Sequence, residues 1–185
     1  ALNMGPETIV GQIRPIITSA EVNRAKSQKK SFAAAWDNQF GSWEYQAVMN
    51  KERGTEIIID WSNNTSVKMS AAQLYDLVFE SNNQWMLSAN GTIFTYEFEA
   101  IIPGLLKRWY AERQEMQRKM NECGDNEIER EFWDKRQLVK KINLNSLYGA
   151  ILNPGCRFFD IRIGQSVTLT GRTITKHMAA QTNKI

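Results

Sequence analysis

The sequence predicts a mixed α/β (α+β) protein in which a long antiparallel helical hairpin is joined to a small antiparallel sheet. Three observations lead to this class. Two segments with helical spacing, of roughly 20 and 26 residues, are separated by only a few residues. An alternating segment surrounds an Asn-Gly pair, and a β-branched segment precedes it. Hydrophobic residues make up 42% of the 185 positions, which is enough for a folded core.

The first half of the chain carries both helix and strand signals. The spacing from Ser19 to about Trp36 predicts a helix that starts at a serine cap. Residues from Thr55 to Trp61 are rich in β-branched side chains and predict a strand. Ser70 followed by Gln73 is typical of a capping box and predicts a helix through Val78. No linker-like segment divides the chain, so we expect no independently folding domains.

The segment from Trp85 to Glu99 alternates between apolar and polar residues around Asn90-Gly91. An Asn-Gly pair is the strongest short signal for a two-residue hairpin turn. We therefore expect a β-hairpin whose apolar side chains join the sheet. These side chains are Trp85, Leu87, Ile93 and Phe94.

Two long helices follow. Pro103 is suited to be the first residue of a helix, and Gly124 is suited to end it. Asp125 or Asn126 can cap the next helix, which continues to about Leu152. Because the turn between them is short, the two helices must lie antiparallel and side by side.

The last part of the chain follows the break at Asn153-Pro154-Gly155. Arg157 to Arg162 predicts a strand, and the Thr-rich segment after Gly164 predicts a helix. That helical pattern reaches the end of the chain without a stop signal, so we expect a truncated helix there.

Composition excludes several classes of protein. No apolar run approaches the roughly 20 residues that span a bilayer, and the amino-terminus lacks the basic-then-apolar pattern of a secretory signal, so we expect a cytoplasmic protein without membrane contact. Cys123, Cys156 and His177 lack the spacing of a zinc site or a disulfide framework. The net charge is +3, and five of the six charged residues after Lys141 are basic, which is typical of a polyanion partner or of a solvated face.

The second long helix carries two neighbouring stripes. The first stripe is predicted to be core and contains Trp133, Lys140, Leu144, Leu147 and Ile151. The second contains Gln137, Lys141, Asn145 and Tyr148. A cation, an amide and a phenol then follow one another over roughly 10 Å of helix, a length comparable with a nucleoside triphosphate.

The first long helix carries one cation on its apolar stripe. Arg113 shares that stripe with Leu106, Trp109, Met116 and Met120. A guanidinium there needs an anion, which is a ligand or the carboxylate of Glu115 or Glu131, unless the side chain extends to solvent. Arg118 lies on another side of the helix and is the weaker candidate.

The segment from Lys141 to Gly149 resembles the Lys-x-x-x-Asn-Ser-x-Tyr-Gly motif of family B DNA polymerases. Three stretches are similar to the replicative polymerases of T-even-type bacteriophages: Asn3 to Gly11, Ser88 to Met120, and Lys141 to about Arg172. The resemblance implies that residues 1–95 form a palm-edge segment with a family-divergent insert and a hairpin. Residues 96–152 would form the fingers, and residues 153–185 would return into an incomplete palm.

The resemblance also implies roles for single residues. Arg113 and Lys141 would contact the triphosphate of the incoming deoxynucleotide, with Asn145 beside them. Tyr148 would lie at the nucleotide as well, and with Gly149 it would form the floor of the nascent base pair. The partners would be primer-template DNA, deoxynucleoside triphosphates and the remaining polymerase segments.

The sequence departs from the phage pattern at two places. The position of a second fingers cation is Gln117, although Arg118 follows it, and residues 12–87 are unlike the phage relatives. The two aspartate motifs that hold Mg²⁺ in this family do not occur in the chain, so we expect no catalytic or metal-binding residue in it. Asp60 ends an apolar strand but lacks the continuation of a metal motif, and we interpret it as structural.

The sequence therefore predicts a fragment of a DNA-directed DNA polymerase, a nucleotidyltransferase of DNA replication that binds nucleotide through its fingers domain. The isolated fragment is expected to be inactive, and a phage origin would place it in the host cytoplasm. The alternatives are a non-catalytic helical module that binds nucleic acid and an interaction scaffold.

Overall fold

The structure is a computed structural model that describes residues 2–15 and 41–182. The chain divides into two compact units, which we describe separately. One contains Ala1–Glu7 and Glu99–Gly164, and the other contains Thr8–Phe98 and Gln165–Ile185. The helix predicted from Ser19 to Trp36 lies outside the described residues.

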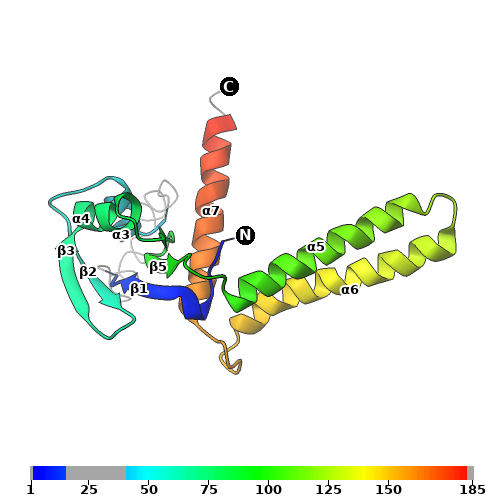
Figure 1. Ribbon diagram of the computed structural model, residues 1–185. Helices are drawn as coiled ribbons and strands as arrows, with labels where there is room; N and C mark the ends of the chain where they lie inside the picture. The colour runs from blue at the N-terminus through cyan, green and yellow to red at the C-terminus, as the bar shows by residue number, and fades with distance from the viewer. Residues whose placement is uncertain (1, 16–40, 183–185) are drawn as a thin grey trace, which may run out of the picture. The chain divides into compact units, whose positions relative to one another are not determined.

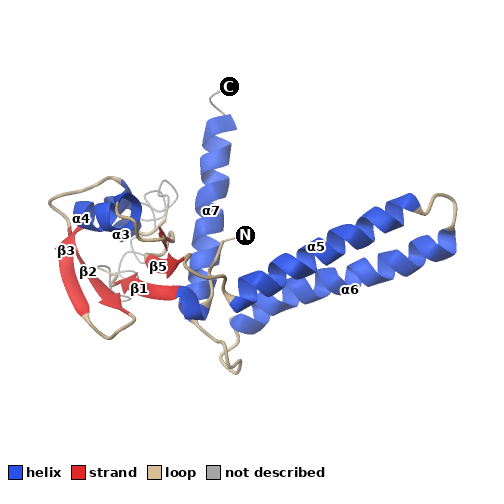
Figure 2. Ribbon diagram, in the orientation of Figure 1, coloured by secondary structure: helices blue, strands red, loops and turns tan. Residues whose placement is uncertain are grey.

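The second unit contains a five-stranded antiparallel sheet within its described residues (Figures 1 and 2). The strands are β1 (Ile9–Ile13), β2 (Glu56–Trp61), β3 (Ser66–Ser70), β4 (Trp85–Leu87) and β5 (Thr92–Thr95). Their order in the sheet is β3-β2-β1-β5-β4. Strand β2 is the β-branched segment that the sequence predicts, and the mixed α+β class is confirmed.

Short helices pack with this sheet to form its core. They are α3 (Trp43–Met49), α4 (Ala71–Tyr75) and the π-helical turn η2 (Asp76–Glu80). The predicted capping box is confirmed, because Ser70 accepts from the amide of Gln73 while the Gln73 side chain accepts from the amide of Ser70. The largest apolar side chains buried in this core are Ile13, Val48, Ile57, Ile59, Leu74 and Ile93.

The predicted hairpin is confirmed, but its turn is longer than two residues. Ser88 donates its amide to the Thr92 carbonyl at 2.8 Å, so Ala89, Asn90 and Gly91 form a three-residue loop. Only Gly91 has a positive φ, of 83°, whereas a two-residue turn of the expected type needs positive φ at both central residues. The side chain of Asn90 explains the difference, because it is bound in a polar network beneath the loop.

That network connects the loop to α7 (Ile161–Thr182). The buried hydroxyl of Ser166 donates to Asn90 Oδ1 at 2.8 Å and lies 3.2 Å from the Ser88 hydroxyl. One turn further along α7, Thr170 Oγ1 accepts from the Ala89 amide at 3.1 Å. Buried polar groups are tolerated when they are bonded in this way, so the network fixes α7 to the β4–β5 loop.

The predicted strand from Arg157 to Arg162 is wrong. Its backbone groups pair locally, since Phe159 donates its amide to the Cys156 carbonyl at 3.0 Å. Asp160 then accepts from the amide of Arg162 at 2.9 Å as α7 begins. A strand needs a neighbouring strand for its amides, and these local bonds replace one. Helix α7 includes the Thr-rich segment that the sequence predicts.

The first unit contains the long helical hairpin, α5 (Ile101–Glu122) and α6 (Glu127–Ile151). Gly124 follows α5, and Asn126 caps α6 by accepting from the Glu129 amide at 3.2 Å, so both of these predicted ends are confirmed. The predicted start at Pro103 is wrong by two residues. Asn3 accepts from the Ala100 amide at 2.8 Å and Glu7 from the Ile101 amide at 2.5 Å, which starts the helix earlier.

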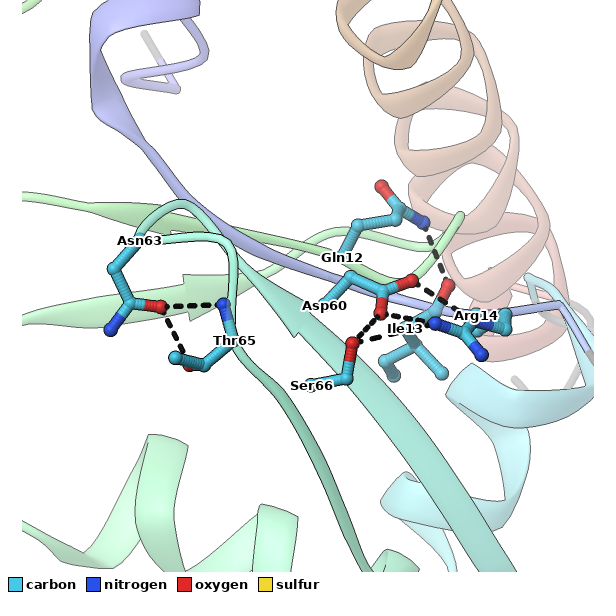
Figure 3. A network of polar contacts seen from close by, with 7 residues as sticks. All are labelled: Gln12, Ile13, Arg14, Asp60, Asn63, Thr65 and Ser66. Carbon is cyan, nitrogen blue, oxygen red and sulfur yellow. Dashed lines mark hydrogen bonds and ion pairs between the residues drawn. The ribbon is translucent and has the colours of Figure 1, made fainter.

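Asp60 links β2 to β3 and to Arg14, which directly follows β1 (Figure 3). Arg14 donates to both oxygens of its carboxylate, at 2.6 and 3.1 Å, and the Ser66 hydroxyl donates at 2.6 Å. The hydrogen bond from Arg14 holds the pKa of Asp60 below its ordinary value, and the bond from Ser66 acts in the same direction. These contacts support the interpretation of Asp60 as a structural residue.

We expect Ser166→Ala to lower the free energy of unfolding by about 1 kcal/mol, because Asn90 then loses a buried donor. Denaturant unfolding measures this loss. Gln165→Ala is the matched control, since its side chain is exposed on the same helix and should change stability little. Equal stability of the two variants would contradict the structural role of the network.

We expect Asp60→Asn to destabilise the protein at pH 7 but not in strong acid. The folded carboxyl has a lowered pKa, so its contribution is present above the unfolded pKa and is lost as the pH falls through the folded pKa. Thermal unfolding of both proteins from pH 7 to pH 2 measures the difference. Arg14→Gln should give a similar loss at pH 7, and the double variant should add little; additive losses would speak against a shared contact.

Candidate functional site

The candidate site lies on the hairpin of α5 and α6, whose facing stripes agree with the sequence pattern. Trp133, Lys140, Leu144, Leu147 and Ile151 are all half-buried or buried. Lys140 forms a 2.5 Å ion pair with Glu112 of α5, and its ammonium also lies 5.6 Å from the centre of the Trp109 ring. The hydrogen bond from Lys140 lowers the pKa of Glu112. A lysine thus occupies the apolar stripe because the opposite helix supplies a carboxylate.

Arg113 faces the second stripe of α6. Its Nε donates to Gln137 Oε1 at 3.2 Å, so its partner is neither Glu115 nor Glu131. Gln137 is held in turn by Asp134, to which it donates at 2.9 Å. Within the described residues the terminal nitrogens of Arg113 have no polar partner. Arg113 is therefore half-buried and faces a neutral amide, with most of its donors unused.

Lys141 and Asn145 follow Gln137 at successive turns of the same stripe. Both side chains are exposed, and neither makes a polar contact with another described residue. No direct contact joins them to Arg113 in the described part of the chain. Arg113 of α5 faces their stripe at Gln137, but the structure does not bring the three side chains into contact. An exposed ammonium and a neighbouring amide can both donate to an anion.

Tyr148 and Gly149 lie near the end of α6. Tyr148 is half-buried, and its hydroxyl donates to the Gly164 carbonyl at 2.8 Å. Gly149 is exposed, and a Cβ atom at its position would meet no atom within 4 Å. The helix thus presents a fixed phenol beside a stretch of open backbone.

Arg118 does not replace the cation that is missing at Gln117. Its guanidinium is bound by Glu115 at 2.7 Å and by Glu122 at 2.5 Å, both on its own helix. These hydrogen bonds raise the pKa of Arg118. The side chain is therefore engaged along the outside of α5.

Two residues that contact the candidate site or the stripe beside it were missed by sequence reasoning. Glu112 balances Lys140, and a lysine on an apolar stripe was the signal for such a partner. Gly164 accepts from Tyr148, and a glycine within the first turns of a helix was the signal for a close approach, since glycine disfavours helix.

We find no metal site in the described ranges, where no three His, Cys, Asp or Glu side chains gather closely enough to hold an ion. Asp60, the one carboxylate weighed above as a ligand, is bonded to Arg14 and Ser66. The described residues therefore do not fit the two magnesium ions that the resemblance implies. None of the described helices is both long and apolar enough to cross a bilayer.

The comparisons place this chain among polymerases. The family model described as DNA polymerase family B matches residues 56–185. A DNA polymerase of Pyrococcus glycovorans is 42% identical over 79 residues, which are 43% of this chain and 10% of that protein. A DNA polymerase catalytic subunit of Alcelaphine herpesvirus 1 is 32% identical over 79 residues, covering 43% of this chain and 8% of that protein. A DNA polymerase of a Desulfurococcus strain is 38% identical over 82 residues, covering 44% of this chain and 10% of that protein.

This chain spans about a tenth of the length of these relatives. They are archaeal and herpesviral, so they do not support the phage subgroup, which stays a prediction. The family match begins inside residues 12–87, the stretch to which the sequence resemblance assigned no role, and it continues through the hairpin and α7. Because the match covers well over half of the sequence, the chain belongs to DNA polymerase family B.

Proposed function

We propose that this chain is the part of a DNA-directed DNA polymerase that binds the incoming deoxynucleoside triphosphate through a fingers hairpin at residues 96–152. The observation that carries the proposal is the direction of Arg113. Its Nε is bonded to Gln137, so its guanidinium lies against the stripe that continues with Lys141 and Asn145. A triphosphate laid along this stripe meets all three side chains.

The charges support this assignment. Arg113 retains unused donors in a planar fork, which suits phosphate oxygens. Lys141 adds an exposed ammonium, and Asn145 adds an amide donor. The helices that carry them are held in register by Lys140 and Glu112, which keeps Arg113 opposite the stripe of α6. Donors at these positions can stabilise the charge that develops as the primer hydroxyl attacks the α-phosphate.

Tyr148 and Gly149 have a second role in this proposal. A flat ring beside exposed backbone can contact the minor-groove edge of the new base pair, where correct pairs present acceptors at similar places. Tyr148 would thereby also touch the bound nucleotide. The pair would favour nucleotides that form a correctly shaped base pair.

The proposal assigns the remaining chemistry to other segments. Residues 1–95 and 153–185 would contribute parts of the palm, and primer-template DNA would bind to the assembled enzyme. Family B polymerases use divalent metal ions, and the carboxylates for Mg²⁺ would come from elsewhere in the polymerase. A T-even-type phage origin, with the enzyme in the host cytoplasm, is part of the same proposal.

We expect Lys141→Ala to slow single-turnover incorporation by about a hundredfold in a polymerase that carries this chain together with the missing segments. Affinity for primer-template should hardly change, because Lys141 faces the nucleotide and not the duplex. Lys135→Ala is the matched control, since Lys135 is exposed on the same helix and paired with Glu131 at 2.7 Å. Equal losses of incorporation and DNA affinity in Lys141→Ala would identify a DNA contact instead.

We expect the chain by itself to extend no primer, whatever the supply of Mg²⁺ and triphosphates, because the aspartate motifs are absent from it. It should still bind a deoxynucleoside triphosphate more tightly than a monophosphate, which calorimetric titration measures. A helical module that binds nucleic acid would instead prefer DNA, with a steep dependence on salt. Primer extension by the isolated chain would overturn the fragment interpretation.

A further inference from the structure

The side chain of Leu152, which caps the end of α6, packs directly against Gly164 near the start of α7. Gly164 is the fourth residue of α7 and is buried. A Cβ atom at this position would overlap Leu152 Cδ2 and lie 3.1 Å from Leu152 Cγ. Gly171, on the same helix, has open space around it. The absence of a side chain at Gly164 thus permits an approach that no other residue type allows with Leu152 in its present place.

This close approach brings a backbone acceptor to Tyr148. The phenol donates to the Gly164 carbonyl at 2.8 Å. A helical carbonyl has two lone pairs, so it can accept from the phenol as well as from its own helix. Gly164 both packs against Leu152 and supplies the carbonyl that binds Tyr148. A shift of Gly164 away from Leu152 would therefore also move the acceptor of the Tyr148 hydroxyl.

The bond also fixes the chemistry of the phenol. A phenol has one proton, and here that proton is directed to Gly164. Toward any other group the Tyr148 oxygen is left as an acceptor. Bases in the minor groove present mainly acceptors, so Tyr148 does not donate to them while this bond persists. The Tyr148 ring therefore contributes to selection of the incoming nucleotide through where the ring lies and through its flat shape.

We propose that Gly164 is a positioning residue for Tyr148, holding the phenol ring at the nucleotide site through its carbonyl and through its lack of a side chain. The effect on selection of the correct nucleotide rests on the function proposed above. Its geometric part concerns Tyr148, Leu152 and Gly164 alone and can be tested without catalysis.

The geometric test uses the 185-residue chain labelled with 3-fluorotyrosine and observed by fluorine NMR. Tyr148→Phe identifies the Tyr148 resonance by its loss. Gly164→Ala should move that resonance and leave those of Tyr45, Tyr75 and Tyr96 in place. Gly171→Ala, the matched control, should move none of them. An unmoved Tyr148 resonance in Gly164→Ala overturns the proposal.

A rescue variant distinguishes a local effect of Gly164→Ala from general misfolding. Leu152→Ala removes the atoms that a new Cβ would meet, so Leu152→Ala combined with Gly164→Ala should return the Tyr148 resonance toward its original position. Failure of this rescue, with the tyrosine resonances of the sheet unit also displaced, would mean that Gly164→Ala disturbs the fold as a whole, and it would overturn the positioning role.

The functional test uses the longer polymerase. Gly164→Ala and Tyr148→Phe should each raise the ratio of incorrect to correct incorporation by about fivefold, the factor that one hydrogen bond of typical net strength represents. The two together should raise it no further, because they remove the same bond. If Tyr148→Phe leaves this ratio unchanged, the role proposed for Tyr148 at the nucleotide fails, while the NMR result still decides the geometric part.

Discussion

The antiparallel register of α5 and α6 is the constraint on which the candidate site depends. A helix advances about 100° per residue, so a slip of one residue would carry Lys141 away from the side that Arg113 faces. Apolar contacts alone tolerate such slips, because similar side chains recur along both stripes. The ion pair between Lys140 and Glu112 does not tolerate a slip, because it joins two single charged groups at one position of the half-buried interface between the helices. Specifying register is the best-attested use of an ion pair in such a setting.

The parts of the fold that follow from neighbouring residues could be predicted from the sequence. The capping box at Ser70 and the cap at Asn126 each depend on a residue three positions away, and both were found. The wrong strand at residues 157–162 is explained by local bonds, but two other errors occurred where the deciding partner is distant in sequence. Asn90 was expected in a tight turn, but its side chain bonds to Ser166; Pro103 was expected to start α5, but Asn3 and Glu7 bind the amides before it. Local propensity carries no information on such partners.

The same distinction holds for the candidate site. Helical periodicity was sufficient to place Lys141, Asn145 and Tyr148 on one stripe, but it could not choose a partner for Arg113, and Gln137 was not among the alternatives. Helix α7 was recognised only as a Thr-rich helix. In the structure three of its small residues lie where other segments touch it: Gly164 meets Leu152, and Ser166 and Thr170 meet the β4–β5 loop. Composition indicates a helix there, and the contacts account for small side chains at these three positions.

The amino-terminal segment that binds the start of α5 has a consequence for biosynthesis. The Asn3 side chain accepts from the Ala100 amide, 97 positions later in the chain. At a typical synthesis rate of about 5 to 20 residues per second, the segment waits roughly 5 to 20 seconds on the ribosome before its partner emerges. Helix α5 can coil as soon as it is made, since its own bonds are local. Its first turn is bound by a segment that is made earlier, so Asn3 and Glu7 can bind the amides of Ala100 and Ile101 as soon as these emerge, before α6 has been made.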